Sequence, residues 1–115
     1  MIVKFQSVAT ANVIMFGDVA RRLLEALGKE PTARGVFTPE EYPAALERLN
    51  ALVEAEKAVK KGEAVPAHVA EVGVEPHELI GLGIRARPLI QMFEQAGKSK
   101  KPVTWEAPAD FFTEA

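Results

Sequence analysis

A short apolar run near the N-terminus constrains the fold of this chain more than any other feature. Residues 13–16, Val-Ile-Met-Phe, carry no charged or polar side chain and are too few to form a helix of their own. The segment before them, Ile2 to Val8, alternates in part between apolar and polar residues, which is typical of a half-buried strand. Residues 9–12 lie between the two segments and include Asn12, which tolerates the positive φ of a turn. We therefore predict an antiparallel hairpin.

The run at residues 13–16 also predicts an interface, because a strand that is apolar on both faces needs cover on both faces. Helices of this chain supply one cover, and a partner subunit is the candidate for the other. The candidate interface residues share an apolar side chain that one small core does not hold easily: Ile14, Phe16, Leu52, Phe111 and Phe112. The alternative is a fuller monomer core on which the C-terminal tail packs.

Two helices are predicted in the first half of the chain. The first opens at Gly17-Asp18, where an acidic residue suits the first turn, and ends before Gly28. The second begins in a capping box, residues 38–41, with proline at its first helical position. Because Pro43 cannot donate a backbone hydrogen bond, we expect a kink or a restart there, followed by a long helix that reaches about Lys61.

The second half of the chain has a weaker pattern. Residues 62–75 show no clean period and are predicted to be a mobile linker. A third helical region starts near Pro76 and ends at Gly97, and Pro88 inside it predicts a bent or two-piece helix. Residues 102–105, Pro-Val-Thr-Trp, read as a last short strand that pairs with the hairpin.

The predicted architecture is a single α+β domain over residues 1–106, with a C-terminal tail at 107–115. An antiparallel hairpin and a C-terminal strand form a small sheet, and three helical regions pack against it. A chain of 115 residues is of one-domain size. Val36-Phe37 is expected to be short and extended.

Composition excludes several classes of function. Without cysteine the chain has no disulfide, no thiolate metal site and no cysteine nucleophile. A formal net charge of −2 argues against wholesale binding to nucleic acid or to an acidic membrane. The longest uncharged apolar stretch is about ten residues, against the roughly 20 that span a membrane. With no export signal visible, we expect a cytoplasmic protein.

No segment combines a nucleophile, a base and an orienting group, so we predict neither an enzyme nor a cofactor. His68 and His77 lie nine residues apart in the least patterned region, without an acidic partner at ligand spacing, and are interpreted as solvent-exposed. Gly81 to Ala86 matches the dinucleotide-binding pattern G-x-G-x-x-A, but Pro88 interrupts the helix that should follow. We interpret its glycines as allowing close packing or a hinge.

A local basic group offers an alternative function, which is weak binding of nucleic acid or of a phosphate ligand. It consists of five cations and a neighbouring tryptophan: Arg85, Arg87, Lys98, Lys100, Lys101 and Trp105. Trp105 would then be a stacking platform for a base. The interpretation we favour is that the cations complement the C-terminus of a helix and that Trp105 packs in the core.

The order of several short motifs resembles one bacterial family. The motifs are Val3-Lys4-Phe5-Gln6-Ser7, Pro39-Glu40-Glu41, Pro88-Leu89-Ile90 and Val103-Thr104-Trp105. Together they are similar to the small proteobacterial proteins grouped as domain of unknown function 1840. The resemblance implies one small cytoplasmic domain, and it implies no activity, because none is established for the family.

The sequence thus favours a non-enzymatic interaction or structural protein that acts as a homodimer. The partner surface is expected in a groove between the sheet and the helical segment Arg85 to Phe93. An unknown protein partner is the further possibility that this interpretation leaves open.

Overall fold

The structure is a computed structural model that describes residues 2–62 and 81–108. Its elements are four strands, β1 (Ile2–Gln6), β2 (Val13–Phe16), β3 (Arg34–Phe37) and β4 (Val103–Glu106), and the helices α1 (Gly17–Ala26), α2 (Tyr42–Lys60) and α4 (Leu82–Lys98), with a short 3-10 helix, η1 (Pro39–Glu41). The strands form one antiparallel sheet in the order β2-β1-β4-β3. The predicted α+β class is confirmed.

The predicted hairpin forms the first half of the sheet. β1 pairs antiparallel with β2, so that Val3 lies opposite Met15. β4 pairs with the free side of β1, as expected for the C-terminal strand. The sheet then gains a fourth strand, because β3 pairs with β4. The sequence indicated only a short extended piece at Val36-Phe37, since the Arg-Gly-Val-Phe segment has too few apolar residues to read as a strand alone.

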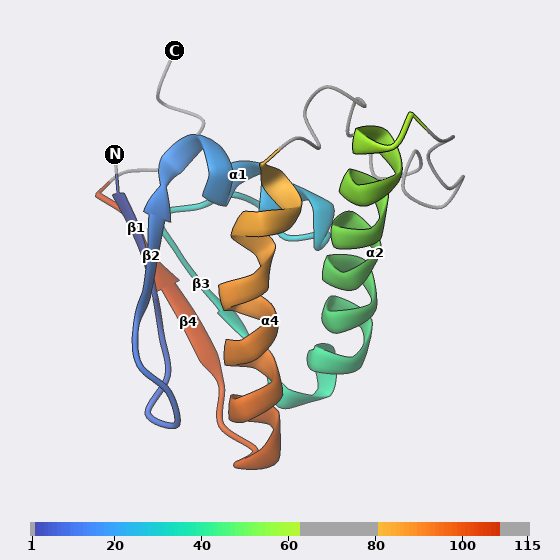
Figure 1. Cartoon of the computed structure of the whole chain (residues 1–115). Helices are drawn as coiled ribbons and strands as arrows, with labels where there is room; N and C mark the ends of the chain where they lie inside the picture. Colours follow the sequence, from blue (N-terminus) through green and yellow to red (C-terminus); the bar gives the residue numbers. More distant parts are fainter. Residues whose placement is uncertain (1, 63–80, 109–115) are drawn as a thin grey trace.

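All three helices lie on one side of the sheet (Figure 1). α4 runs along the sheet, α2 packs along α4, and α1 follows directly from β2 (Figure 1). Strand residues alternate accordingly: Val3 and Phe5 are fully buried under the helices, whereas Ile2 and Lys4 face away from them. We call these two sides the inner face and the outer face of the sheet.

The predicted groove between the sheet and the segment Arg85 to Phe93 is closed. Ala86, Leu89 and Phe93 of this segment are fully buried and belong to the core. The Phe93 ring lies between aromatic neighbours, 4.9 Å from the Phe37 ring and 5.2 Å from the Tyr42 ring. The expectation of a partner surface at this place was therefore wrong, because aromatic packing fills the space.

Leu52 is also a core residue, with 1% of its surface exposed, which corrects its assignment to an interface. The reason is the wide buried face of α2, which includes Leu49, Leu52 and Val53. A helix that packs on a neighbouring helix buries more than the narrow stripe that periodicity alone indicates. Leu52 thus completes the monomer core.

Two proline predictions had different outcomes. At Pro43 the predicted restart is confirmed, because η1 ends at Glu41 and α2 starts at Tyr42. At Pro88 the predicted alternatives were a bent or a two-piece helix, and the two-piece one is excluded, since α4 is one helix from Leu82 to Lys98 with Pro88 inside it. Pro88 has no backbone N–H to donate to the Ile84 carbonyl. Because Pro88 and Ile84 are both exposed, water can donate to that carbonyl instead. The predicted linker after Gly62 and the tail residues Phe111 and Phe112 lie outside the described residues.

Candidate functional site

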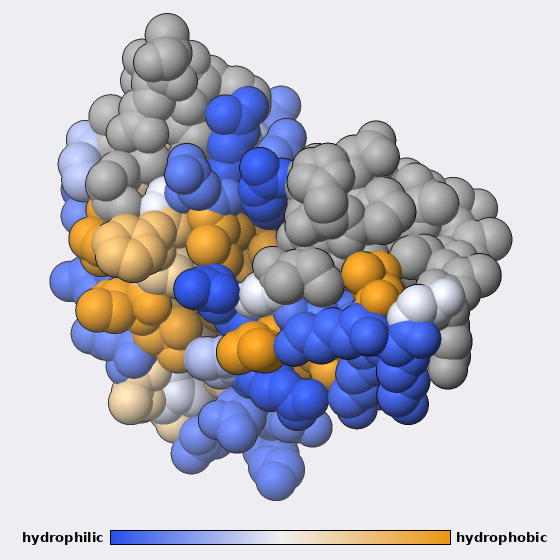
Figure 2. All heavy atoms as spheres, turned by 45° about the horizontal axis from the view of Figure 1, so that its top comes forward, coloured by the Kyte–Doolittle hydropathy of each residue, from blue (hydrophilic) through white to orange (hydrophobic). Residues whose placement is uncertain are grey.

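The outer face of the sheet carries most of the large apolar side chains that the described residues expose. Ile2, Ile14 and Phe16 are 47%, 66% and 68% exposed, and all three lie on β1 or β2. Strand pairing brings them together, because Ile2 lies directly opposite Phe16 and Ile14 is two residues away on the same face. We call these three residues the apolar stripe. Figure 2 shows hydrophobic residues gathered on the flank of the molecule where β1 and β2 lie.

The stripe is a direct consequence of the run at residues 13–16. Successive strand residues point to opposite faces, so four apolar residues in a row must cover both faces. Val13 and Met15 pack partly against the core on the inner face, while Ile14 and Phe16 point outward. The sequence prediction that this run needs a second cover agrees with the exposure of Ile14 and Phe16 in the monomer.

β2 is also an edge strand. Within the part of the chain that the structure describes, β1 is its only neighbour in the sheet. Its second edge therefore presents backbone N–H and C=O groups without a strand partner there. Natural edge strands are usually guarded by lysine, proline or a bulge. β2 contains no charged residue and no proline.

Charged residues border the stripe on the outer face. One row across the sheet reads Ile14, Lys4, Glu106 and Arg34, from β2 through β1 and β4 to β3. Arg34 Nη2 lies 3.5 Å from Glu106 Oε1. The outer face therefore carries the apolar stripe on the β2 side, while the β3 side carries the Arg34–Glu106 pair and one exposed apolar residue, Val36.

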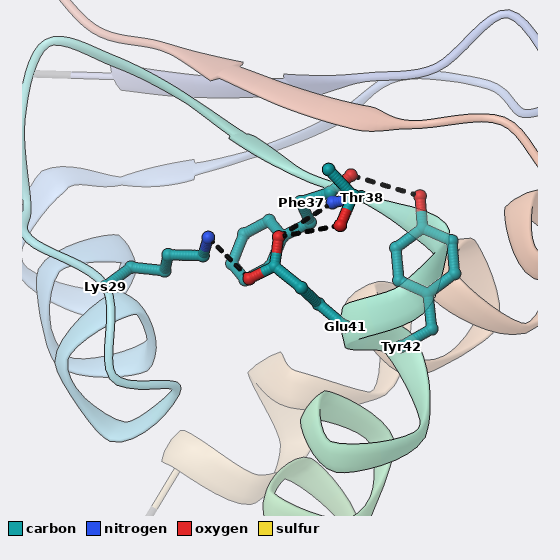
Figure 3. Close-up of polar contacts among 5 residues, drawn as sticks. All are labelled: Lys29, Phe37, Thr38, Glu41 and Tyr42. Carbon is teal, nitrogen blue, oxygen red and sulfur yellow. Dashed lines mark hydrogen bonds and ion pairs between the residues drawn. The ribbon is translucent and has the colours of Figure 1, made fainter.

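A polar cluster fixes the far end of β3 (Figure 3). Lys29 Nζ lies 2.6 Å from the Glu41 carboxylate, and the amide and hydroxyl groups of Thr38 donate to the same carboxylate at 2.9 and 3.1 Å. The hydrogen bond from Lys29, supported by that from the Thr38 amide, lowers the pKa of Glu41 below its ordinary value. These contacts include the predicted capping box and join it to the loop after α1.

Tyr42 completes that cluster. Its hydroxyl donates to the carbonyl of Lys101 at 2.5 Å, and a longer contact of 3.5 Å reaches the carbonyl of Phe37 (Figure 3). Burial raises the pKa of the Tyr42 hydroxyl, and the charge of Glu41 adds to this effect. A carboxylate held ionised by Lys29 and a phenol held neutral by burial are both engaged in structural contacts, which is an arrangement that stabilises the fold rather than one poised for proton transfer.

The five cations of the predicted basic group do not converge. Arg85 lies near the start of α4, where its guanidinium donates to the Gly81 carbonyl at 3.1 Å. Lys98 ends the same helix, which places it about 20 Å away along the axis at about 1.5 Å per residue. Arg87 accompanies Arg85, and Lys100 and Lys101 accompany Lys98. The group is therefore two separate basic regions.

Trp105 is not placed to stack on a ligand. It is 3% exposed on the inner face, its ring lies 5.3 Å from the Phe37 ring, and its indole N–H donates to the Thr32 carbonyl at 2.9 Å. The favoured interpretation of the sequence, a tryptophan packed in the core, is confirmed. The alternative, in which Trp105 stacks on a base of a bound nucleic acid, was wrong, because the ring is buried.

The sequence pairs Glu56 of α2 with Lys60, and their charged groups lie 3.8 Å apart, but the burial of Glu56 was missed. Glu56 is 4% exposed and accepts hydrogen bonds from the backbone amides of Gly81 and Ile84. It therefore occupies the N-terminus of α4, where a bound phosphate would otherwise be favoured. A Cβ atom at Gly83 would lie 2.6 Å from Glu56 Oε1, so this glycine serves close packing, as interpreted. Gly81 instead takes a positive φ of 87° at the N-cap of α4.

A hollow of 340 Å³ lies beside the hairpin loop. The residues that line it have no titratable side chain: Gln6, Ser7, Val8, Asn12, Pro102 and Thr104. None of these side chains titrates near neutral pH, so the lining supplies no acid or base. Across residues 2–62 and 81–108 there is also no cluster of three potential metal ligands.

These observations define a class, an antiparallel α+β domain with an apolar and uncharged sheet edge. The model of one family matches residues 1–105, and its description is domain of unknown function (DUF1840). The chain therefore belongs to this family, as the resemblance implied. The searches of curated proteins and of solved structures each found no match. No helix among the described residues has the length and apolarity needed to cross a membrane.

Proposed function

We propose that this chain is a cytoplasmic, non-enzymatic interaction protein that self-associates as a homodimer through the outer face of β2. The observation that carries the proposal is the combination of an uncharged edge strand with two outward side chains, Ile14 and Phe16, that are about two-thirds exposed. Full burial of side chains of this size contributes roughly 1.5–3 kcal/mol each. A second copy would bury the same two residues again, so the gain is doubled by symmetry.

The two titratable groups with a shifted pKa among residues 2–62 and 81–108 support a structural rather than a catalytic protein. Glu41 and Tyr42 both lie in the cluster that fixes β3 to α2, and each has its hydrogen-bonding capacity used inside the chain. The apolar stripe lies at the other edge of the sheet. Association at β2 therefore does not compete with the contacts that hold the domain together.

The test compares one substitution at each sheet edge. Ile14→Glu places a carboxylate in the proposed interface, while Lys4, directly opposite Ile14, supplies an opposite charge that keeps the folded monomer stable. Val36→Glu is the matched control, because Val36 is also an exposed apolar residue on the outer face but belongs to β3. Both variants add the same charge to the same face of one sheet.

Sedimentation velocity across a concentration series is the measurement. We expect the parent chain and Val36→Glu to dimerise alike, and Ile14→Glu to weaken the dimerisation constant at least tenfold. Taking a carboxylate out of water costs several kcal/mol even beside a cation such as Lys4, which exceeds the roughly 1.4 kcal/mol that a tenfold change represents. A parent chain that stays monomeric at about 100 μM would overturn the proposal, since an obligate dimer is populated at that concentration. Equal weakening by both variants would show that β2 is not the contact.

A further inference from the structure

We infer that the C-terminal tail of this chain folds back over the outer face and covers the apolar stripe with Phe111 and Phe112. These two residues lie outside the described residues, but the stripe and the residues that lead into the tail are described. A tail that covers the stripe competes with a second copy for the same side chains. The competition rests on the proposed homodimer, whereas the cover itself does not.

The tail leaves the sheet beside the stripe. In the pairing of β1 with β4, Lys4 lies opposite Glu106, so the same register continued by two residues puts position 108 opposite Ile2. Ile2 lies in turn opposite Phe16. Pro108, at that position, is exposed like Glu106 before it. The tail therefore starts in the same outward row as two residues of the stripe.

The length of the tail matches the distance that it must cross. Ala107 fixes the start, because it is 8% exposed and its amide donates to the Ala33 carbonyl at 2.7 Å. Strands of a sheet lie about 4.8 Å apart, so β2 is roughly 10 Å from β4, with β1 between them. An extended residue advances about 3.3 Å, so Phe111 and Phe112 reach roughly 10 and 13 Å beyond Pro108. Either phenylalanine can therefore lie on the stripe.

The charge of the tail also fits this side of the outer face. Asp110 and Glu114 flank the two phenylalanines. Lys4 lies next to Ile14 at the border of the stripe, and it makes no ion pair within residues 2–62 and 81–108. A carboxylate of the tail that lies near Lys4 gains a weak but favourable contact. The stripe thus offers the tail both an apolar surface and an opposite charge.

A single thiol can report this cover, because the chain contains no cysteine. We would measure how fast a maleimide labels Ile14→Cys in the full chain with the parent tail and with the double substitution Phe111→Ser/Phe112→Ser. A thiol that is accessible in only about a third of the copies reacts about threefold more slowly. We expect at least this protection by the parent tail, and we expect it at every protein concentration, because the cover lies within one chain.

Val36→Cys is the matched control for the labelling rate. Val36 is also an exposed apolar residue of the outer face, but it belongs to the other edge strand and lies opposite Thr104. Thr104 precedes Pro108 by four residues, so Val36 is far from the point where the tail leaves the sheet. Its labelling rate should be the same with both tails.

Sedimentation of the chain without an added cysteine gives a second readout. The Phe111→Ser/Phe112→Ser chain should dimerise roughly tenfold more tightly than the parent, because both copies must be uncovered and the accessible fraction enters twice. Equal labelling of Ile14→Cys with both tails would overturn the cover and leave the proposed homodimer standing. Protection that persists with the serine tail and grows with protein concentration would also overturn the cover, and it would support the homodimer. Protection by the parent tail in a chain that stays monomeric with either tail would support the cover and overturn the homodimer.

Discussion

The two edges of this sheet are built from strands of equal length and differ in what surrounds them. β3, at one edge, is tied to the rest of the chain by side chains: the Trp105 ring covers Gly35, the Trp105 indole bonds to Thr32, and the Glu41 cluster holds the end of the strand. β2, at the other edge, directs Ile14 and Phe16 outward and away from the core. One edge is closed by the fold, and the other presents an apolar, uncharged border.

This difference suggests a division of roles. Substitutions at β3 should reduce the free energy of unfolding and leave association unchanged, because the contacts of β3 lie within the monomer. Substitutions of the outward residues of β2 should weaken association and leave the free energy of unfolding unchanged.

The largest effect is expected from Gly35→Ala. A Cβ atom at Gly35 would lie 2.0 Å from the Trp105 ring, far inside van der Waals contact, so the ring must move. We expect a loss of about 2–4 kcal/mol in the free energy of unfolding, in the range of severe overpacking. Urea unfolding followed by fluorescence measures this, since Trp105 is the only tryptophan in the sequence.

Val36→Ala serves as the control for Gly35→Ala, because it changes the next residue of β3 on the exposed face. It should cost less than the glycine substitution and leave the tryptophan emission maximum in place. If Gly35→Ala unfolds at the same urea concentration as the parent chain, the packing of Trp105 on Gly35 does not hold β3, and the contrast between the edges weakens.

A smaller effect, dependent on pH, is expected from Glu41→Gln. The pKa of Glu41 is lowered in the folded chain, chiefly by Lys29. Its contribution to stability is therefore present above the unfolded-state pKa and is lost as the pH falls through the lower folded-state pKa. At pH 7 we expect a loss of about 1 kcal/mol, a typical value for a helix cap, because solvent screens a carboxylate that is 38% exposed.

Urea midpoints at pH 7 and at about pH 3 test the Glu41 prediction. The stability difference between parent and variant should shrink at the lower pH, because that pH lies below the unfolded-state pKa and the unfolded chain there takes up the proton more readily. Glu40→Gln is the matched control, since Glu40 lies in the same turn but is exposed. A difference that stays constant over this range would show that the ion pair with Lys29 contributes nothing and that β3 is held by packing alone.

Local patterns predicted some of these features well. The hairpin follows from residues 2–16, where the period of two and the turn lie close together in the chain. The capping box at Thr38 and Glu41 follows from a four-residue motif. The exposure of Ile14 and Phe16 follows from the period of a strand in an apolar run. In each case the decisive contacts are close in sequence.

Features that depend on distant contacts were not predictable in the same way. β3 becomes a strand only because β4, nearly 70 residues later in the chain, pairs with it and covers Gly35. The role of Glu56 depends on amides 25 and 28 residues further along. A glycine at position 83 was the available signal, since it marks a close approach, but a single sequence does not name the group that approaches.

The smallest effect on stability is expected from Arg34→Ala. This variant tests whether the charge of Arg34 alone prevents association at the β3 edge. Arg34 is largely exposed and pairs with Glu106 at 3.5 Å, so its removal should change the free energy of unfolding by about 0.5 kcal/mol or less. In the double variant Ile14→Glu/Arg34→Ala we expect sedimentation to show a monomer, because β3 carries one exposed apolar residue, Val36, where the stripe carries three. A double variant that dimerises again would mean that both edges can pair and that Arg34 is what distinguishes them.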